Sequence, residues 1–174
     1  MATGATYSVK YRRKREQKTN YKRRLNLLKS RITRFVVRPS NKHMIAQLVD
    51  YTEDGDKVIA HATSAELVKM GWKHSTSSTP AAYLTGLLCG SRGKAKGVKK
   101  AILDTGLFPQ VKGSRIYATL KGLIDSGVES PADEEIFPAE ERITGKTLSS
   151  YVQKSKDIEK DFASMKQNIL KPSK

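Results

Sequence analysis

The stretch that decides the fold reads RITRFVVRPSNKHMIAQLVDYTEDGDKVIAH, residues 31–61. β-Branched and aromatic residues are dense from Arg31 to Arg38, and the proline that follows predicts the end of a first strand. Alternating apolar residues predict a second strand from Met44 to Asp50 and a third from Lys57 to His61. Residues 53–56, Glu-Asp-Gly-Asp, supply the turn chemistry of a hairpin between the last two.

Beyond this stretch the pattern changes to helices. Three helices are predicted at residues 63–71, 79–90 and 114–127. The first opens with a capping box, the second with proline at its first position and the third with a serine cap, and each ends at a glycine. A buried-looking strand is predicted at 98–103. Three strands, a helix, a strand and a helix indicate a layered α/β domain.

The N-terminal segment is set apart by its charge. The first forty residues carry thirteen Lys or Arg and one acid, Glu16, whereas the other 134 carry twenty bases and sixteen acids. Residues 1–18 have no apolar period and repel themselves, so we expect a flexible basic arm. Thr19 or Asn20 can then cap a short helix. The predicted parts are an arm with a short helix at 1–29, an α/β core at 30–127, and a linker with a C-terminal helix at 128–174.

The C-terminal part begins with an acidic linker, which holds Pro131, Pro138 and seven acids between Asp125 and Glu141. A last helix is predicted after it, with one narrow apolar stripe. Such a stripe docks on its own domain or on a neighbouring protein. The stripe consists of Tyr151, Ile158, Phe162, Met165 and Ile169.

The polarised charge indicates a nucleic-acid partner. Bases of the arm are interleaved with Tyr7, Tyr11 and Tyr21, which suits a polyanion that offers phosphates and flat bases. A second basic cluster at residues 92–97, predicted as a glycine-containing loop, has no acid near it. Two electropositive surfaces on one small domain favour an RNA with tertiary shape over a single DNA groove. A generic basic DNA-binding module stays open as an alternative.

No membrane or secreted role is indicated. The lone Cys89 suggests a reducing compartment, because it cannot form an internal disulfide. No apolar stretch approaches the ~20 residues that span a bilayer. The N-terminus has charge but no apolar region of a secretory signal. We therefore expect no membrane partner.

Catalytic patterns are weak. Residues 104–106, Asp-Thr-Gly, match the triplet of aspartic proteases, but there is no second triplet, so a structural turn is favoured. Residues 145–147, Gly-Lys-Thr, lack the leading glycine of a phosphate-binding loop. His43, His61, His74 and Cys89 lack the spacing of metal ligands. Asp50, Asp104 and Asp125 leave a magnesium-dependent nuclease as the alternative function. We expect a non-enzyme without cofactor, metal or small-molecule substrate.

Six blocks of the chain, between residues 7 and 146, resemble one family in the same order. They are NYKRRL at 20–25 with LKS at 28–30, VRPSNKH at 37–43, PAAYLTGLL at 80–88, LDTGL at 103–107, RIYATLKG at 115–122 and FPAEERITG at 137–145. The family is that of the 5S-rRNA-binding proteins of the large ribosomal subunit, called L eighteen in bacteria and archaea and L five in eukaryotes. The length and the last block are similar to archaeal members.

This resemblance implies an α/β domain with a mixed sheet and no catalysis. It implies a cytoplasmic protein of the ribosome that clamps 5S rRNA in the central protuberance and joins it to the large-subunit rRNA and to neighbouring ribosomal proteins. The corner at residues 38–43 faces the 5S rRNA in the family. Its residues suit that role, because Pro39 fixes the backbone and the amide, ammonium and imidazole groups that follow can contact unpaired bases and 2′-hydroxyls.

The predicted RNA-binding residues come from the arm, the short helix, the first strand with its corner, and the second basic cluster. They are Lys10, Tyr11, Arg12, Arg13, Lys14, Arg15, Lys18, Tyr21, Lys22, Arg23, Arg24, Arg31, Arg34, Arg38, Asn41, Lys42, His43, Arg92, Lys94 and Lys96.

Overall fold

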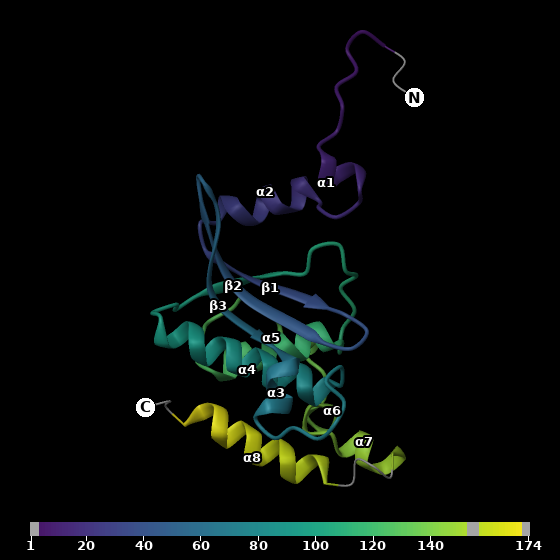
Figure 1. The fold of residues 1–174 in the computed structure, drawn as a ribbon, viewed down its shortest axis with the longest axis vertical. Coiled ribbons are helices and arrows are strands. Elements are labelled where there is room, and N and C mark those ends of the chain that lie inside the picture. The colour runs from purple at the N-terminus through teal and green to yellow at the C-terminus, as the bar shows by residue number, and fades with distance from the viewer. Residues whose placement is uncertain (1–3, 153–156, 172–174) are drawn as a thin grey trace.

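The structure is a computed structural model, and it describes residues 4–152 and 157–171. Its elements form layers around one sheet. Figure 1 shows helix α2 (Tyr21–Lys29) above the sheet, helices α4 (Thr79–Ala95) and α5 (Arg115–Asp125) below it, and α8 (Ile158–Leu170) beneath these. The predicted α/β layered class is confirmed.

The sheet has four strands in the order β3-β2-β1-β4. Strands β1 (Thr33–Pro39), β2 (Met44–Thr52) and β3 (Gly55–Thr63) pair antiparallel, whereas β4 (Ala101–Asp104) lies parallel to β1. The sheet is therefore mixed, as the resemblance implies. The predicted turn at 53–56 is confirmed, although Gly55 and Asp56 already belong to β3.

Alternation along the strands separates the two faces of the sheet. Phe35 and Val37 of β1 are fully buried against the α4 and α5 layer, and Ala46 and Leu48 of β2 join them. Helix α3 (Ser64–Lys69) closes one end of this core with the predicted capping box, in which Glu66 accepts the Thr63 N–H at 2.9 Å. The hydrophobic core thus lies on one face only and leaves the other for polar residues.

Helix α4 does not end at Gly90, as the sequence suggested, but continues to Ala95. Gly90 is a glycine because of close packing between helices, and not because the helix ends there. A methyl group at Gly86 or Gly90 would overlap Thr119 or Ser126, so these glycines let α5 approach the backbone of α4. The helix ends instead before Gly97, whose φ of +84° lies in the left-handed region.

The C-terminal part is more helical than a plain linker. A 3₁₀ turn, η1 (Glu134–Ile136), and two short helices, α6 (Glu140–Thr144) and α7 (Lys146–Tyr151), precede α8. Four residues of the predicted stripe are buried on α8, but Tyr151 lies in α7 and is 83% exposed, so its assignment to the stripe was wrong. The stripe docks on the protein's own core, where Phe162 packs 5.4 Å from the Tyr83 ring.

The N-terminal segment places α2 over the open face of the sheet, whereas the described chain before α1 extends away from it (Figure 1). Helix α1 (Arg12–Arg15) is one turn, and α2 begins after Asn20, whose side chain accepts the Arg23 N–H at 3.1 Å. Strand β1 starts at Thr33 and not at Arg31, because Arg31 has a φ of +53° and ends the helix in a left-handed turn. Similarly β4 starts at Ala101, three residues later than predicted.

Candidate nucleic-acid interface

Helix α2 covers the open face of the sheet through polar contacts. None of its residues is buried. Arg24 forms an ion pair with Asp56 at 2.9 Å, and Arg23 donates from Nη1 to the Gly106 carbonyl at 3.2 Å. Guanidinium groups that reach down to β3 and to the end of β4 thus help to hold the helix, whose Leu27 and Leu28 are half-buried.

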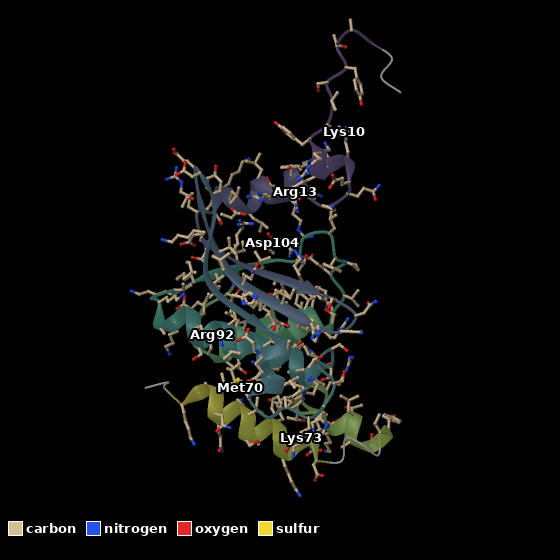
Figure 2. The ribbon with its side chains drawn as sticks, viewed as in Figure 1. Lys10, Arg13, Met70, Lys73, Arg92 and Asp104 are labelled. Carbon is tan, nitrogen blue, oxygen red and sulfur yellow. The ribbon has the colours of Figure 1, made fainter. Side chains whose placement is uncertain are left out.

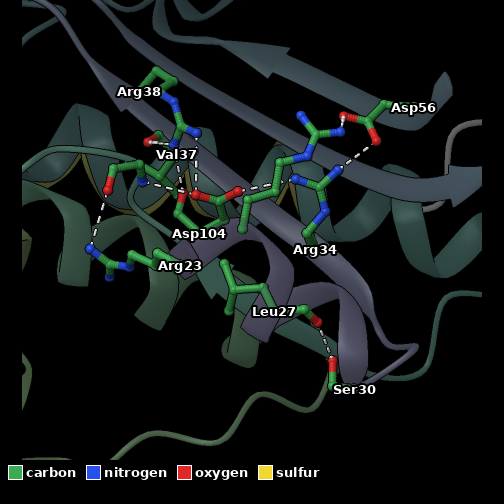
Figure 3. A network of polar contacts seen from close by, with 10 residues as sticks. Arg23, Leu27, Ser30, Arg34, Val37, Arg38, Asp56 and Asp104 are labelled. Carbon is green, nitrogen blue, oxygen red and sulfur yellow. Dashed lines mark hydrogen bonds and ion pairs between the residues drawn. The ribbon is translucent and has the colours of Figure 1, made fainter. Parts of the chain in front are cut away.

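Beneath α2 lies a network of charges centred on Asp104 (Figure 3). Arg34 Nη1 lies 3.1 Å from Oδ2, Arg38 Nη2 lies 3.2 Å from Oδ1, and the Gly106 N–H donates to Oδ1 at 2.8 Å. Burial alone would raise the pKa of Asp104, but the Arg38 charge, the Gly106 hydrogen bond and Arg34 outweigh it and lower that pKa below 3.8. Asp104 is therefore an ionised partner of two arginines.

Arg34 is buried, unlike the other predicted RNA-binding residues. Its side chain is 4% exposed, and it also reaches Asp56 at 2.8 Å. A guanidinium enclosed between two carboxylates holds the network together, so Arg34 has a structural role here, and its contact with RNA stays a prediction. The Asp-Thr-Gly triplet is the structural turn that the sequence favoured, with Gly106 at a φ of +62°.

Bases without a carboxylate partner are concentrated in the arm and α2. Glu16 lies 3.9 Å from Arg12 and 2.9 Å from Lys18, so it neutralises part of this local excess. Tyr11 is 72% exposed and its ring lies 5.2 Å from that of Tyr21, which forms an aromatic pair among the bases. Within the described residues, eight of the thirteen bases of positions 1–40 form no ion pair with a carboxylate. These are Lys10, Arg13, Lys14, Arg15, Lys22, Arg23, Lys29 and Arg31.

The corner after β1 is a tight, braced turn. The Ser40 N–H donates to the His43 carbonyl at 2.8 Å, and the His43 N–H donates to the Ser40 hydroxyl at 2.9 Å. The Thr76 hydroxyl donates to the Lys42 carbonyl at 2.6 Å. Asn41 and Lys42 are exposed, whereas His43 is half-buried. The turn therefore presents the first two side chains outward and holds the imidazole partly inside.

The second basic cluster differs from the predicted loop. Arg92 and Lys94 lie in α4, and only Lys96 follows it. Arg92 forms an ion pair with Glu66 at 2.7 Å, and Lys96 donates to the Ile59 carbonyl, so these two groups tie α4 to α3 and β3. Figure 2 shows Arg92 on the opposite side of the sheet from Lys10 and Arg13. The structure thus does not bring this cluster together with the arm.

The residues weighed for catalysis lie apart. Asp104 is paired with arginines, and Asp125 accepts a hydrogen bond from the Tyr83 hydroxyl at 2.6 Å. Asp50, on β2, lies opposite Lys57 of β3.

Other signs of catalysis or of a metal site are also weak. Burial raises the pKa of the Cys89 thiol to about 12, which opposes a role as nucleophile. Residues 4–152 and 157–171 contain no group of three or more His, Cys, Asp or Glu side chains placed to hold a metal ion. Nor does any helix in these ranges have the length and apolarity to cross a membrane.

Sequence reasoning missed three residues of the charged network and the corner. Asp56 was predicted only as part of a turn, although it receives both Arg24 and Arg34. Gln47 lies on β2 beside the charged network. Arg115 contacts the corner by donating to the Ser40 carbonyl at 3.5 Å, and it also donates to the Ser77 carbonyl at 2.9 Å. The alternation of β1, in which Arg34, Val36 and Arg38 share one face, was the signal that could have located the network.

Comparison with known proteins identifies the family of this chain. The family model of ribosomal large subunit proteins 60S L5 and 50S L18 matches residues 5–99, from the arm to just beyond α4. The large ribosomal subunit protein uL18 of Korarchaeum cryptofilum (strain OPF8) is 48% identical over 166 residues, which cover 94% of this chain and 85% of that protein. The chain therefore belongs to the family of large-subunit ribosomal proteins that includes 60S L5 and 50S L18.

Proposed function

We propose that this protein binds 5S rRNA and attaches it to the large-subunit rRNA in the central protuberance, beside other ribosomal proteins. Membership of the family makes it a component of the large ribosomal subunit with rRNA as its partner, and the family is not one of enzymes. The observation that carries the finer proposal is the single basic surface formed by the arm and α2.

That surface suits RNA for two physical reasons. Eight bases without carboxylate partners are concentrated on a segment that has one acid, so a polyanion gains many phosphate contacts there and releases its counterions. The exposed Tyr11 and its neighbour Tyr21 add flat rings on which unpaired bases can stack. A protein that needed only non-specific charge would not require the aromatic pair.

The corner at residues 38–43 adds a second contact to the proposal. Its turn is fixed by Ser40 and braced by Thr76, so Asn41 and Lys42 are presented from the edge of a rigid sheet. Side-chain amide and ammonium groups held in this way suit base edges, 2′-hydroxyls and phosphates of a folded RNA. Arg92 and Lys96 lie apart from this surface, each with one contact within the protein, and their contact with RNA stays a prediction.

The test is competition at moderate salt. Labelled 5S rRNA bound to the purified protein is challenged with unlabelled 5S rRNA, with tRNA and with duplex DNA of equal phosphate content. We expect only unlabelled 5S rRNA to displace the label at low excess. Equal displacement by all three would reduce the protein to a generic polyanion binder, and cleavage of the RNA in the presence of magnesium would favour the nuclease.

A further inference from the structure

A hollow of about 210 Å³ lies between α2 and the open face of the sheet, and we name it the α2 hollow. This volume is far more than the ~10–15 Å³ that one water molecule occupies by a similar measure. Its floor includes Val36, Val49 and the Gln47 side chain, and its walls come from α1, α2, β1 and the end of β4. The hollow is therefore enclosed between the N-terminal helices and the sheet, and it is not a groove on the surface of a single element.

The charge of the α2 hollow is strongly positive. Two carboxylates line it, Asp56 and Asp104, and each is already met by two arginines. Six bases line it, an excess of four positive charges. These are Arg13, Lys18, Arg23, Arg24, Arg34 and Arg38. Like charges gathered under a helix repel one another, so the arrangement favours an additional anion.

One of the residues that line the α2 hollow, Arg34, has a buried donor without an acceptor. Arg34 is 4% exposed, and nothing in the described part of the chain accepts a hydrogen bond from its Nε. Its Nη2 lies 2.8 Å from Asp56, close enough for an ion pair but not aligned for a hydrogen bond. A buried donor without a partner is costly, so a ligand oxygen that accepts from Arg34 would bind favourably.

We infer that the α2 hollow is a phosphate-binding pocket that takes one backbone phosphate of the bound RNA. A phosphate has several acceptor oxygens, which can be shared between guanidinium groups of the helix and of the sheet. Arg13 and Arg23 would approach it from the N-terminal side, and Arg34 and Arg38 from the strand side. This inference rests on the proposed RNA-binding function and names the group that this part of the surface recognises.

A phosphate in this position would also fasten α2. None of its side chains is fully buried, and Arg23 and Arg24 supply polar contacts that hold it to the sheet and to the end of β4. An anion shared between α2 and β1 would replace repulsion between their arginines with attraction. Binding of RNA and docking of the helix are therefore coupled.

Gln47→Glu tests the pocket because it adds a negative charge to the hollow and leaves every arginine in place. Gln167→Glu is the matched control, since it makes the same change at an exposed position of α8, far from the hollow. The probe is inorganic phosphate, followed by NMR at the Arg34 Nε–Hε resonance. The second measurement is the affinity of each protein for 5S rRNA.

We expect phosphate to shift the Arg34 resonance saturably in the parent and in Gln167→Glu, but not in Gln47→Glu. We also expect Gln47→Glu to bind 5S rRNA about tenfold more weakly than the control. This is the size of one charge-assisted hydrogen bond to the phosphate, which the added carboxylate would repel. If no protein shows the shift, the pocket is refuted. If the shift behaves as expected but the RNA affinities are equal, the hollow takes only free phosphate and the inference fails. A parent that binds phosphate but not 5S rRNA refutes the proposed function instead.

A second pair of variants covers the case in which Gln47→Glu does not fold. Arg13 and Arg15 lie on the same turn, but only Arg13 lines the α2 hollow. Arg13→Gln should abolish the phosphate shift at Arg34 and weaken 5S rRNA binding more than Arg15→Gln does. Equal behaviour of the two variants in both measurements would overturn the inference.

Discussion

Arg34 and Asp104 are both charged and both nearly buried, and each charge is tolerated because the other is present. Asp104 also forms an ion pair with the half-exposed Arg38, and Arg34 also forms one with Asp56. The pair therefore couples β1 to β4 and, through Asp56, to β3 and α2. Removing one partner leaves a buried charge unbalanced, which costs more than the pair contributes when it is intact.

Asp104→Asn should destabilise the fold by about 3 kcal/mol at pH 7. The lower end of the range for a broken buried pair applies, because Asp56 still faces Arg34. The measurement is urea denaturation, with the exposed Asp54→Asn as the control, for which we expect a change within about 0.5 kcal/mol. Equal stability of the two variants would show that the buried pair contributes nothing.

The stability difference between the parent and Asp104→Asn should depend on pH. The pKa of Asp104 is lowered in the folded protein, so its contribution is complete above the ordinary carboxyl pKa of about 3.9 and is lost as the pH falls below it. The stability gap between the parent and Asp104→Asn should therefore be constant from pH 7 to about pH 4 and shrink at lower pH. A gap that closes between pH 7 and pH 5 would contradict the lowered pKa.

Asn41 and His43 give the residue-scale prediction for RNA binding. Replacing both by Ala should weaken 5S rRNA binding by about 1–3 kcal/mol, the scale of a base-edge hydrogen bond or a stacked base. The slope of affinity against salt should not change, because neither residue carries a fixed positive charge. Fluorescence anisotropy at several salt concentrations measures both quantities, with the exposed Asn168→Ala of α8 as the control. A double variant that melts normally and binds like the parent would remove the corner from the site.

At the scale of elements, glycine spacing sets how α4 and α5 pack. Sequence reasoning placed both helices and the Ser114 cap of α5, but α4 is capped by Ser78, one residue before the predicted start, and Gly90 was wrongly used as an end signal. In the structure Gly86, Gly90 and Gly122 lie where the helices meet, and Gly97 marks the end. Gly97 ends the helix, whereas Gly90 allows a close approach of two helices. The sequence does not distinguish these two roles, because the difference depends on where the partner helix lies. The layers depend on this contact, because α4 also packs against β2, β3 and α8.

Gly86→Ala tests that contact. The added methyl group would overlap the Thr119 carbonyl, which belongs to the backbone and cannot rotate away. We expect α4 and α5 to separate slightly and the free energy of unfolding to fall by about 1–3 kcal/mol, as in other overpacked cores. Thermal denaturation measures the change. Gly4→Ala is the control, because a methyl group there meets nothing within 4 Å; an unchanged melting temperature for Gly86→Ala would contradict the close approach.

At the scale of the whole molecule, more of the fold than of the candidate site could be predicted from the sequence. The strands at 31–61 and the capped helices follow from local patterns, since alternation and caps are read along the chain. Arg34 and Arg92 could not be assigned in this way, because their carboxylate partners, Asp104 and Glu66, are distant in sequence. A basic residue looks the same in the sequence whether it faces solvent or a carboxylate, and only the folded chain distinguishes the two.

The polarised charge leads to a prediction for the whole complex. Deleting residues 1–18 removes six bases and one acid, while Asn20 remains to cap α2 and the core stays intact. Four of these bases, Lys10, Arg13, Lys14 and Arg15, have no carboxylate partner among the described residues. If each meets one phosphate, the slope of log affinity for 5S rRNA against log salt should flatten by roughly 3. Replacing only these four by Gln, which keeps the arm's length, should flatten it equally, because the slope counts phosphates and not residues. A slope that is unchanged in both variants, with normal melting, would show that the arm does not touch the RNA.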